Sequence, residues 1–594
     1  MVQNKNKDLD KKRHSLAHVL AMAVLERFPE AKIGIGPTIE NGFYYDFDFS
    51  GAKKGIVPED LPKIEERIKE LISHDLKFKK EAITFEQAKK LFKNQKYKIE
   101  LIKELNDQKK AISIYGTFGK DPKETFVDLC AGPHVKSTKE INKDAFKLTK
   151  LAGAYWRGSE KNQMLTRVYG VAFNTPDELK DYLKLLEEAE KRDHRVLGEK
   201  MDLFMFDENI GKGLPLWLPK GYLIRHLIED YIYKVEQENG YLHVLTPELA
   251  KEVLYKTSGH LAHYKEDMYC PIEIENEKYY LRPMNCPHHH SIYKHKLRSY
   301  KDLPLRIAEF GTVYRYERSG VLSGLIRVRG FTQNDAHIYI TPEKLEAEII
   351  KILEIHKKVF DDFKILDYWF RLSLPNFKNK EKYGDIKNKK MWEQGAEALK
   401  KVLNKQKIKF VEGVGEATFY GPKIDVQIKN IYGKEDTIAT IQVDYYSAGR
   451  FNLNYIDKDG KEKSVVIIHR AILGSFERFF AFLLEKTAGV LPLWLAPAQV
   501  RIINIGEGHR KYAEDILSEL KKNKIRAELS DEDSTVSKKI REAELQKIPY
   551  ILVVGDKEIQ NKSVNVRHYK RGQEGEVDLD AVIKKINEEI ENKA

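Results

Sequence analysis

Glu309-Phe-Gly-Thr-Val-Tyr-Arg-Tyr-Glu317, followed after a loop by Arg327-Val-Arg-Gly-Phe331, is the stretch that decides the fold of this chain. It places arginines, a glutamate and a phenylalanine in two neighbouring segments. Cations of this kind suit a nucleotide phosphate, and an aromatic face suits a purine base. A single strand rich in arginine is more often a solvated face or a nucleic-acid patch. The ordered combination of phosphate-type and base-type side chains instead favours a nucleotide site.

Three residues before and after this stretch form a second pattern. Cys286 lies in Leu281-Arg-Pro-Met-Asn-Cys-Pro287, His337 follows Phe331 by six residues, and His469 opens His469-Arg-Ala-Ile-Leu-Gly-Ser-Phe-Glu-Arg478. One thiolate and two imidazoles suit a tetrahedral zinc ion whose fourth position stays free for a substrate. Their spacing alone proves little, because a cysteine and two histidines this far apart are usually unrelated core residues. The sequence segments around these three residues instead favour a shared zinc site.

These segments resemble those of class II aminoacyl-tRNA synthetases. The opening stretch is similar to motif 2 of that class, and Gly474-Ser-Phe-Glu-Arg478, before an apolar helix, is similar to motif 3. The Thr246-Pro247 strand, after the amphipathic helix from Tyr222 to Asn239, resembles motif 1, the dimerisation element. With the zinc-type residues the match narrows to the threonyl-tRNA synthetases of the bacterial type. It continues through Phe419-Tyr-Gly-Pro-Lys423 and Ile441-Gln-Val-Asp444 and covers nearly the whole chain.

The resemblance implies a role for each residue of the nucleotide site. Arg315 bridges the amino-acid carboxylate and the α-phosphate of ATP, and Glu317 accepts from the adenine amine. Phe331 stacks on one face of the base, while Arg478 covers the other face and reaches the γ-phosphate. The residues expected to bind ATP, with its Mg²⁺, are Arg315, Glu317, Arg327, Phe331, Lys423, Gln442 and Arg478. The residues expected to be catalytic are Arg315, Arg478 and His260.

One zinc ion per chain, held by Cys286, His337 and His469, is the metal that the resemblance implies. Threonine and valine are nearly isosteric, and an apolar pocket separates isosteres poorly. A metal that accepts both the amine and the side-chain hydroxyl of L-threonine rejects valine, which lacks the hydroxyl. Serine lacks only one methyl, which is worth about 1–3 kcal/mol, so serine remains as the error. The residues expected to contact threonine are Met284, Gln333, Asp335, Tyr420 and Gln442.

A second group of histidine and cysteine residues, near the N-terminus, is expected to remove serine that has been attached in error. Arg13-His-Ser-Leu-Ala-His18 carries two histidines four residues apart, which a helix places on one face. Asp128-Leu-Cys-Ala-Gly-Pro-His134 carries a cysteine and a histidine with the same spacing. In the threonyl-tRNA synthetases this set is the editing site, which hydrolyses seryl-tRNA without a metal. A second zinc site and plain core packing stay open as alternatives. The expected editing residues are His14, His18, Asp128, Cys130 and His134.

The expected fold class is a multidomain α+β protein. Residues 1–175 form an N-terminal α+β editing domain, with charged helices between 62 and 98, and residues 176–199 form a linker helix capped by Thr175. Residues 200–496 form the class II catalytic domain, an antiparallel sheet flanked by helices. Residues 497–594 alternate short apolar strands with amphipathic helices, which predicts a small α/β domain with a parallel sheet. By resemblance this last domain binds the tRNA anticodon, through Asp533, Glu558 and Arg567.

The composition agrees with an RNA-binding protein of a reducing compartment. The chain has 594 residues and a formal charge of +12, which suits a polyanionic partner such as tRNA(Thr). It has three cysteines, of which two fall in the proposed sites, and its N-terminus lacks an apolar signal segment. No stretch approaches the roughly 20 apolar residues of a membrane helix. We expect a cytoplasmic homodimer that binds ATP, L-threonine and tRNA(Thr) and no membrane.

The chain departs from the family pattern at four places, one of which is Asp533, where some anticodon sites have an asparagine. A small ubiquitin-like domain usually precedes the editing domain, whereas here His14 lies close to Met1. Neither expected reaction requires the residues of that domain. His288 stands where a glycine is usual, and we expect it to form a surface cluster with its two neighbouring histidines rather than to compete for the metal. Thr437 stands where a glutamine is common on the ATP side.

Three other interpretations are less favoured. A non-catalytic paralogue that binds RNA predicts loss of the motif arginines or of the zinc-type residues, and all of them are present. A free-standing editing hydrolase would lack the segments beyond residue 200. A class II enzyme for another amino acid, such as proline or serine, has no need of the zinc-type set together with the histidine and cysteine pairs near the N-terminus.

Overall fold

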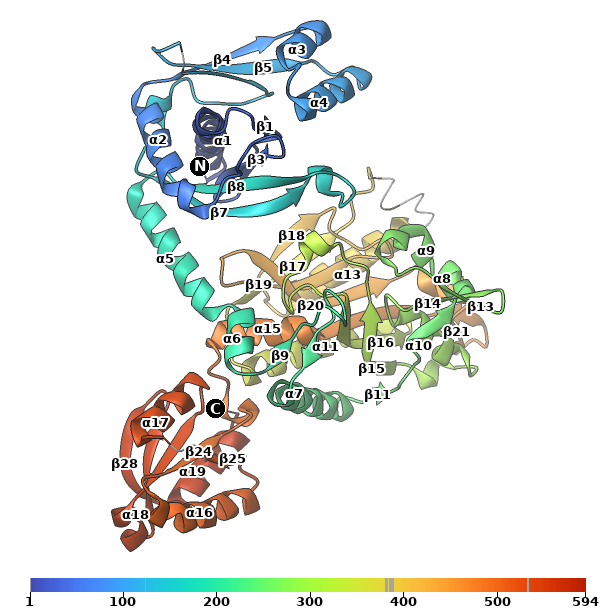
Figure 1. Ribbon diagram of the computed structural model, residues 1–594. Coiled ribbons are helices and arrows are strands. Elements are labelled where there is room, and N and C mark those ends of the chain that lie inside the picture. The colour runs from blue at the N-terminus through green and yellow to red at the C-terminus, as the bar shows by residue number, and fades with distance from the viewer. Residues whose placement is uncertain (1, 123, 380–382, 384–388, 531–533, 594) are drawn as a thin grey trace. The chain divides into compact units, whose positions relative to one another are not determined.

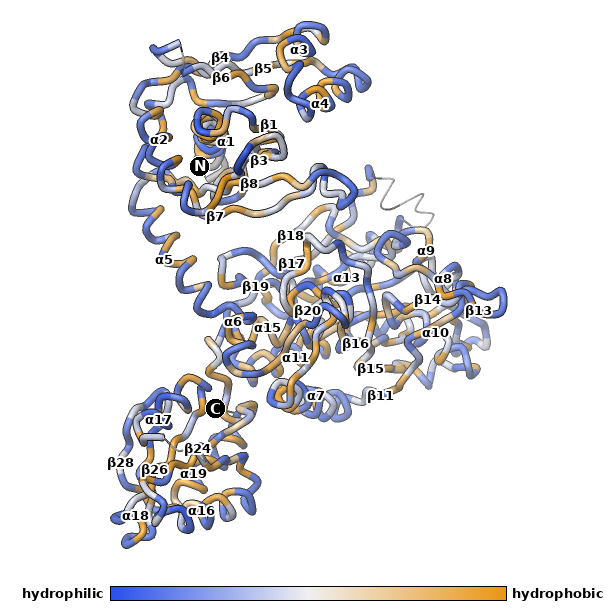
Figure 2. The backbone as a smooth tube through the Cα atoms, viewed as in Figure 1, coloured by the Kyte–Doolittle hydropathy of each residue, from blue (hydrophilic) through white to orange (hydrophobic). Residues whose placement is uncertain are grey.

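Figure 1 shows the computed structural model of the chain, which describes residues 2–122, 124–379, 383, 389–530 and 534–593, with side chains from residue 7 onward. The chain divides into two compact units, residues 1–187 and residues 188–594. Apolar residues gather along strands such as β8 (Met164–Ala172) in the first unit and β26 (Tyr550–Val554) in the second, as the orange stretches of Figure 2 show, whereas β16 (Gly330–Ile340) carries many polar residues. Among the described helices, none is long and apolar enough to cross a membrane.

The first unit is built around a long helix and two antiparallel sheets. Its elements are α1 (Val2–Arg27), β1 (Lys32–Ile33), β2 (Thr38–Ile39), β3 (Gly42–Asp48), α2 (Leu61–Ser73), β4 (Lys77–Ala82), α3 (Phe85–Leu91), α4 (Lys96–Asp107), β5 (Ser113–Phe118), β6 (Thr125–Leu129) and β7 (Phe146–Tyr155), with β8 after them. One sheet has the order β1-β3-β8-β7, with β2 paired to β3, and the other has the order β4-β5-β6. The apolar face of α1 packs against β3 and α2, which buries the core of this unit.

The predicted charged helices between residues 62 and 98 are only partly correct. The helices α2 and α3 lie there, but β4 is a strand between them. Every side chain of β4 except Phe78 is exposed, so the segment lacks the apolar and polar alternation that reveals a strand. Its strand conformation follows from pairing with β5, which the local sequence does not encode.

The second unit contains an eight-stranded sheet in the order β11-β15-β16-β23-β20-β19-β17-β18. Its strands besides β16 are β11 (Leu242–His243), β15 (Leu305–Tyr314), β17 (Tyr368–Leu374), β18 (Phe410–Val414), β19 (Lys423–Lys429), β20 (Glu435–Asp444) and β23 (Val466–Ser475). The five inner pairings are antiparallel, as predicted, and the two edge pairings, β11–β15 and β17–β18, are parallel. Three helices pack against the sheet, α11 (Leu345–Asp362), α13 (Lys389–Lys405) and α15 (Phe476–Thr487).

Smaller elements surround this sheet. They are β9 (Phe204–Met205), β10 (Leu216–Trp217), α7 (Pro219–Glu238), β12 (Leu249–Lys251), α8 (Glu252–Ser258), α9 (His260–His263), β13 (Ile272–Ile274), β14 (Glu277–Leu281), α10 (Cys286–Lys294), α14 (Ser447–Phe451), β21 (Asn454–Ile456) and β22 (Glu462–Ser464). The helix α7 confirms the amphipathic helix predicted after residue 222. The predicted Thr246-Pro247 strand is wrong, because both residues lie in the loop after β11. Pro247 has no N–H to pair, and the N–H of Thr246 is donated to the Glu309 carboxylate at 2.9 Å.

The linker consists of two helices rather than the single helix expected to about residue 197. The first is α5 (Pro176–Arg192), and Thr175 caps it as predicted, accepting the N–H of Glu178 at 3.2 Å. The second is α6 (His194–Lys200). The helix breaks at Asp193, whose side chain accepts the N–H of Arg195 at 2.8 Å and so starts a new helix.

The end of the second unit is a five-stranded sheet in the order β25-β24-β26-β27-β28, with four helices. Its elements are β24 (Val500–Asn504), α16 (Arg510–Lys522), β25 (Ala527–Leu529), α17 (Val536–Leu545), β26 (Tyr550–Val554), α18 (Asp556–Asn561), β27 (Ser563–His568), β28 (Gly572–Asp578) and α19 (Leu579–Glu591). The first three strands are parallel, as predicted. The last two are antiparallel, which corrects the prediction of a wholly parallel sheet. A six-residue helix precedes β27, and a hairpin joins it to β28, so neither connection is long enough for a parallel crossover.

Candidate active sites

A cleft of about 400 Å³ opens over the middle of the eight-stranded sheet. Phe331, Gln333 and Asp335 lie two residues apart on β16, so their side chains point to the same face of the sheet. His337 continues this row, and it lies directly opposite His469 on β23. Gln442 on β20 is the neighbour of His469 on the other side. Strand register therefore brings together residues that are far apart in the sequence.

Nearly all residues predicted for the catalytic domain line this cleft. They are Met284, Cys286, Arg315, Glu317, Arg327, Phe331, Gln333, Asp335, Tyr420, Lys423, Gln442, His469 and Arg478. His337 is fully buried beneath them. Thr437, which stands where the family has a glutamine, also lines the cleft and accepts from Gln427 Nε2 at 2.7 Å.

The nucleotide-type residues gather at one end of the cleft. The Arg315 guanidinium lies 5.1 Å from the centre of the Phe331 ring. Arg327 Nε lies 3.0 Å from Glu317 Oε2, so this pair is held together across the motif 2 loop. Arg478 lies in the first turn of α15, the helix that follows β23. Its Nε donates to the Ile326 carbonyl at 3.1 Å. Three guanidinium groups thus share one cleft with an aromatic ring, which suits a bound nucleotide.

The zinc-type residues meet at the floor of the same cleft. The ligand atoms of Cys286, His337 and His469 all lie within 4.8 Å of one another. Within the described residues, Nε2 of His337 is buried and has no hydrogen-bond partner. The Nε2–H of His469 donates to Asp444 Oδ2 at 2.9 Å, and the ring also has the Cys286 thiol as a hydrogen-bond partner. A thiol and two imidazoles converge here with their ligand atoms close together, so the donor set fits one zinc ion.

Several neighbours of this cluster were not singled out in the sequence. Asp444 orients His469, and Asn285 Nδ2 donates to Asp335 Oδ2 at 3.1 Å. His289 lies three residues after Cys286 on α10, so helical spacing places it on the same face, and that spacing was the available signal. Its Nδ1 lies 2.8 Å from Nδ1 of His337.

The expected surface cluster of three histidines is wrong. His288, His289 and His290 are exposed by only 7%, 0% and 1%. His289 Nε2 lies 2.9 Å from Glu309 Oε2, and His290 Nδ1 lies 2.9 Å from the Tyr339 hydroxyl. The helix α10 packs this run into the sheet, and polar partners on β15 and β16 satisfy His289 and His290 there.

His260 lies apart from the cleft. It lines a small adjoining cavity with Met284, Cys286 and Tyr420. Its Nδ1 lies 2.6 Å from Ser258 Oγ and its Nε2 lies 3.1 Å from the sulfur of Met284. Burial lowers the pKa of His260 to about 4, so the ring is neutral at neutral pH. Its predicted catalytic role stays a prediction.

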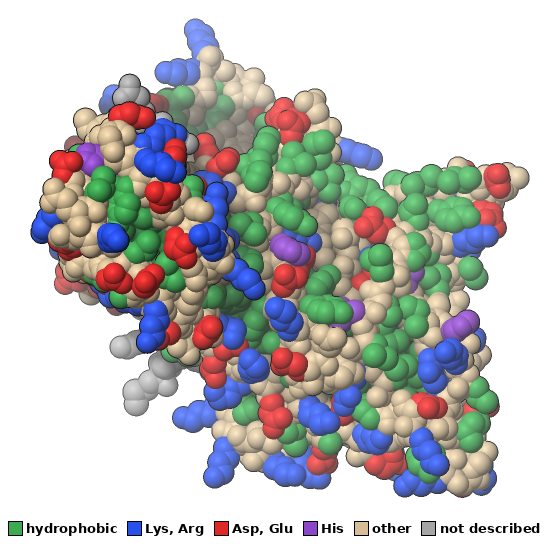
Figure 3. All heavy atoms as spheres, turned by 90° about the horizontal axis from the view of Figure 1, so that it is seen from below, with side chains coloured by type: hydrophobic (Ala, Val, Ile, Leu, Met, Phe, Trp, Pro, Cys, Tyr) green, Lys and Arg blue, Asp and Glu red, His purple; other side chains and the backbone are tan. Residues whose placement is uncertain are grey.

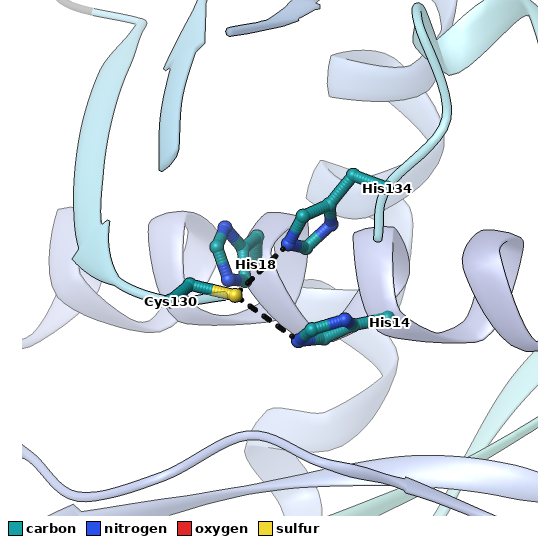
Figure 4. Close-up of side chains that lie close together, drawn as sticks. All are labelled: His14, His18, Cys130 and His134. Atoms are coloured by element: carbon teal, nitrogen blue, oxygen red, sulfur yellow. Dashed lines mark hydrogen bonds between the residues drawn. The ribbon is translucent and has the colours of Figure 1, made fainter. Parts of the chain in front are cut away.

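The four candidate editing residues also come together, as Figure 4 shows. Cys130 Sγ lies 3.4 Å from His14 Nε2 and 3.2 Å from His134 Nε2. His18 stands one turn along α1 from His14, and the ligand-type atoms of all four lie within 4.8 Å of one another. Burial raises the pKa of Cys130 to about 11 and holds the pKa of His18 well below its usual value. The site therefore presents a neutral thiol and neutral imidazoles at neutral pH.

Asp128 lies behind this cluster in a buried network. Lys98 Nζ lies 2.5 Å from Asp128 Oδ1, and the Tyr45 hydroxyl donates to Asp128 Oδ2 at 2.5 Å. His18 Nε2 lies 3.7 Å from Asp128 Oδ2. Asp128 thus pairs with Lys98 and lies next to His18. Nothing in the sequence marked Lys98, because it lies among many exposed lysines of charged helices.

A third group of ligand-type residues in the described chain, Asp193, His194 and Glu485, has a different character. His194 Nδ1 lies 2.6 Å from Glu485 Oε1, and its Nε2 accepts the N–H of Leu325 at 3.0 Å. Both ring nitrogens are therefore in use. This group fixes α6 to α15 and to the motif 2 loop, and it has no nitrogen left for a metal.

Two of the residues expected to read the anticodon lie close together near the end of the second unit. Glu558 on α18 and Arg567 on β27 line one pocket of about 260 Å³. Glu558 accepts the N–H of Gly555 at 3.0 Å, and Arg567 Nε lies 3.0 Å from Glu544 Oε1. Asp533 lies outside the described residues.

Comparison with known families now gives the class of the protein. Residues 269–487 match the "tRNA synthetase class II core domain (G, H, P, S and T)", and residues 499–589 match the "Anticodon binding domain". Together with the sheet and its cleft, these matches define a class II aminoacyl-tRNA synthetase. Residues 112–169 match the "Threonyl and Alanyl tRNA synthetase second additional domain".

The relatives narrow the class to one family. The threonine–tRNA ligase of Oceanobacillus iheyensis is 45% identical over 99% of this chain and 89% of its own length. That of Dehalococcoides mccartyi is 47% identical over 94% of this chain and 93% of its own. A crystal structure of the RNA binding domain of threonyl-tRNA synthetase from Cryptosporidium parvum, 37% identical, has a TM-score of 0.62 and covers 67% of this chain and 98% of that one. The chain belongs to the threonine–tRNA ligase family, which confirms the resemblance.

Proposed function

We propose that this chain activates L-threonine with ATP and Mg²⁺, transfers it to tRNA(Thr), and hydrolyses seryl-tRNA(Thr) at a separate site. One observation carries the first part of the proposal. The cleft that holds Arg315, Phe331 and Arg478 for a nucleotide also ends on the Cys286, His337 and His469 cluster. A nucleotide and a small amino acid bound at its two ends meet at Arg315.

At the proposed amino-acid end, Cys286, His337 and His469 would hold one zinc ion, which would supply a Lewis acid for the amine and hydroxyl of threonine. The protein's own side chains orient the substrate. Asp335 offers a carboxylate to the amine, and Asn285 fixes that carboxylate. The Tyr420 hydroxyl donates to Gln442 Oε1, which closes the other wall. A site built to use the hydroxyl rejects valine, whereas serine differs by one methyl and passes.

The test of the proposed function is tRNA charging by the full chain. Purified protein with ATP and Mg²⁺ should attach threonine to tRNA(Thr) and leave tRNA of other specificities uncharged. Charging of tRNA with proline or serine as the preferred amino acid would overturn the proposal and point to another class II enzyme.

We propose that the editing reaction occurs at His14, His18, Cys130 and His134, by orienting water rather than through a protein nucleophile. An ester of tRNA is already activated, so water needs only orientation and a proton acceptor. The raised pKa of Cys130, which burial causes, supports this choice because the thiolate is the nucleophilic form. Neutral His14 and His134 flank the thiol and have lone pairs to accept a proton.

The pocket of Glu558 and Arg567 is proposed to read anticodon bases, and Arg567→Ala tests it. Arginine presents paired donors to a guanine edge, and losing such a contact costs about 1–3 kcal/mol, or about 5- to 150-fold in binding. We expect tRNA charging to fall by this factor while threonine activation without tRNA stays near normal. Arg510→Ala is the matched control, because Arg510 pairs with Glu514 and has the same side-chain exposure, 42% against 41%. Equal loss in both assays would indicate misfolding and contradict the assignment.

We propose a homodimer formed through α7 and the segment after β11. Leu242, Leu245 and Leu249 are exposed by 58%, 89% and 41%, and Tyr222 on α7 by 55%. Figure 3, which views the molecule from below, shows hydrophobic side chains among charged ones on the face of the second unit turned to the viewer. Three exposed leucines between residues 242 and 249 favour an interface at this segment. The chain is also proposed to be cytoplasmic, as its cysteines Cys130, Cys270 and Cys286 are unpaired.

Replacing both Leu242 and Leu245 by Asp should produce a monomer with most of its threonine activation lost. A charge on each protomer opposes burial of the apolar face. Thr246 follows Leu245 directly and donates its N–H to the buried Glu309. We therefore expect loss of the interface to disturb the residues beneath the cleft. Leu366→Asp, at a leucine exposed by 70%, is the control and should leave both properties unchanged. Sedimentation that finds the parent protein to be a fully active monomer would contradict the dimer.

A further inference from the structure

A chain of buried polar contacts runs from the loop after β11 to the zinc-type cluster. Thr246 donates to Glu309 from its N–H at 2.9 Å and from its hydroxyl at 2.9 Å. Glu309 Oε2 lies 2.9 Å from His289 Nε2, and His289 Nδ1 lies 2.8 Å from His337 Nδ1. Glu309, His289 and His337 are each exposed by 1% or less. All three side chains are shielded from bulk solvent, so protein groups set the directions of these contacts.

Hydrogen-bond chemistry shows which ring nitrogens these contacts use. Glu309 also receives Arg282 NH1 at 3.3 Å. Burial alone would raise the pKa of Glu309, but the contacts with His289, Thr246 and Arg282 lower it to about 2, so it is a carboxylate. A carboxylate only accepts, so His289 donates to Glu309 from Nε2, and its other nitrogen, Nδ1, faces Nδ1 of His337. Because this contact occupies Nδ1 of His337, Nε2 is the nitrogen of His337 that is left for a metal.

Nε2 of His337 is the nitrogen that is buried without a protein partner within the described residues. It is also the nitrogen on the side of Cys286 and His469. A metal binds the unprotonated nitrogen of an imidazole, and the partner of the other nitrogen selects which one that is. The contacts of His289 and Glu309 thus select the tautomer of His337 that a metal needs.

We propose that Glu309 and His289 are a positioning pair that holds His337 in its metal-binding tautomer and orientation. This inference rests on the proposed zinc site and adds two residues that do not touch metal or substrate. Asp444 does the same for His469, at 2.9 Å, so both imidazoles are oriented by a carboxylate, one directly and one through a second imidazole. Thr246 ties the pair to the loop beside the exposed Leu245.

The role proposed for Glu309 and His289 predicts that variants of these two residues differ in zinc affinity. Losing an outer partner of a metal-binding histidine costs about 10- to 100-fold in affinity, and we expect this loss for His289→Ala. His289→Asn keeps an oxygen near the position of Nδ1 that accepts the Nδ1–H of His337, so its affinity should return most of the way to that of the parent. Glu309→Gln changes one atom, but its amide can donate to His289 and reverse the direction of the chain. It should therefore lose affinity like His289→Ala.

The experiment measures zinc binding by the full-length protein against a competing chelator, with no activity assay. Cobalt is used as a second probe, because its visible bands report whether the ion keeps a four-coordinate site. His356→Asn is the matched control: His356 is equally buried, at 1%, but its Nδ1 bonds the Ile352 carbonyl of its own helix and not a residue of the zinc-type cluster, so the variant should keep the parental zinc affinity. Thermal unfolding of the zinc-free proteins shows whether the variants differ in folding.

Three outcomes decide whether Glu309 and His289 position His337. Loss in His289→Ala and Glu309→Gln with recovery in His289→Asn, while His356→Asn binds normally, supports the pair. Parental zinc affinity and an unchanged cobalt spectrum in His289→Ala overturn it. A parent protein that binds no zinc overturns the proposed metal site itself, and the wild-type measurement alone reveals that case.

Discussion

Cys286→Ala is expected to abolish threonine-dependent ATP–pyrophosphate exchange. Cys286 is the one residue of the three that would bind the proposed zinc as an anion, and its thiolate would neutralise part of the metal charge. Loss of an outer partner alone costs about 10- to 100-fold, so loss of this ligand should lower both zinc content and activation by more than about 100-fold. Metal analysis and exchange are measured on the same preparation.

The control for this variant is Cys270→Ala. Cys270 is exposed and lies outside the cleft, so its replacement should leave zinc content and exchange unchanged. A Cys286→Ala protein that keeps its zinc and activates threonine normally would show that the cluster does not serve selection. Two zinc ions per parent chain would instead revive the alternative metal site at His14, His18, Cys130 and His134.

Replacing both His14 and His18 by Ala should let seryl-tRNA(Thr) accumulate while threonyl-tRNA(Thr) synthesis stays near normal. The two histidines lie on one face of α1 and belong to a unit that contains no residue of the cleft. The remaining discrimination rests on one methyl, so about one serine should be attached per 10–200 threonines at equal concentrations. The measurement is release of serine from preformed seryl-tRNA, beside charging with each amino acid.

His74→Ala serves as the control in the same unit, because His74 pairs with Glu124 outside the editing cluster. It should release serine at the parental rate. A double variant that also releases serine at that rate would show that editing occurs elsewhere. A separate Cys130→Ser variant that retains hydrolysis would exclude a covalent route through the thiol.

The sequence was sufficient for the parts of the site that repeat a local pattern. Phe331, Gln333 and Asp335 alternate on one strand, and motif order alone placed Arg315 and Arg478 in the same cleft. His14 and His18 share a helix face because they are four residues apart. Such spacings survive folding unchanged, whereas the meeting of distant segments in one cleft and the antiparallel centre of the large sheet were expected only from the resemblance to class II synthetases.

The features that the sequence did not predict depend on contacts between residues that are far apart in the chain. The charged sequence of β4 resembles the exposed face of a helix, and only its pairing with β5 makes the segment a strand. The last two strands of the C-terminal sheet reverse direction because short connections replace a crossover. His289 appeared to be a surface residue, and only the packing of α10 against β15 brings it to Glu309. No local propensity encodes these contacts, which tertiary packing decides.

The measurement that tests the central claim most directly is pyrophosphate exchange with threonine, valine and serine, on protein of known zinc content. The account predicts one zinc per chain, strong exchange with threonine, and exchange with serine lower by about 10- to 200-fold. It predicts almost none with valine, because valine has no hydroxyl to offer the site. Active protein without zinc, or exchange with valine equal to that with serine, would contradict the account.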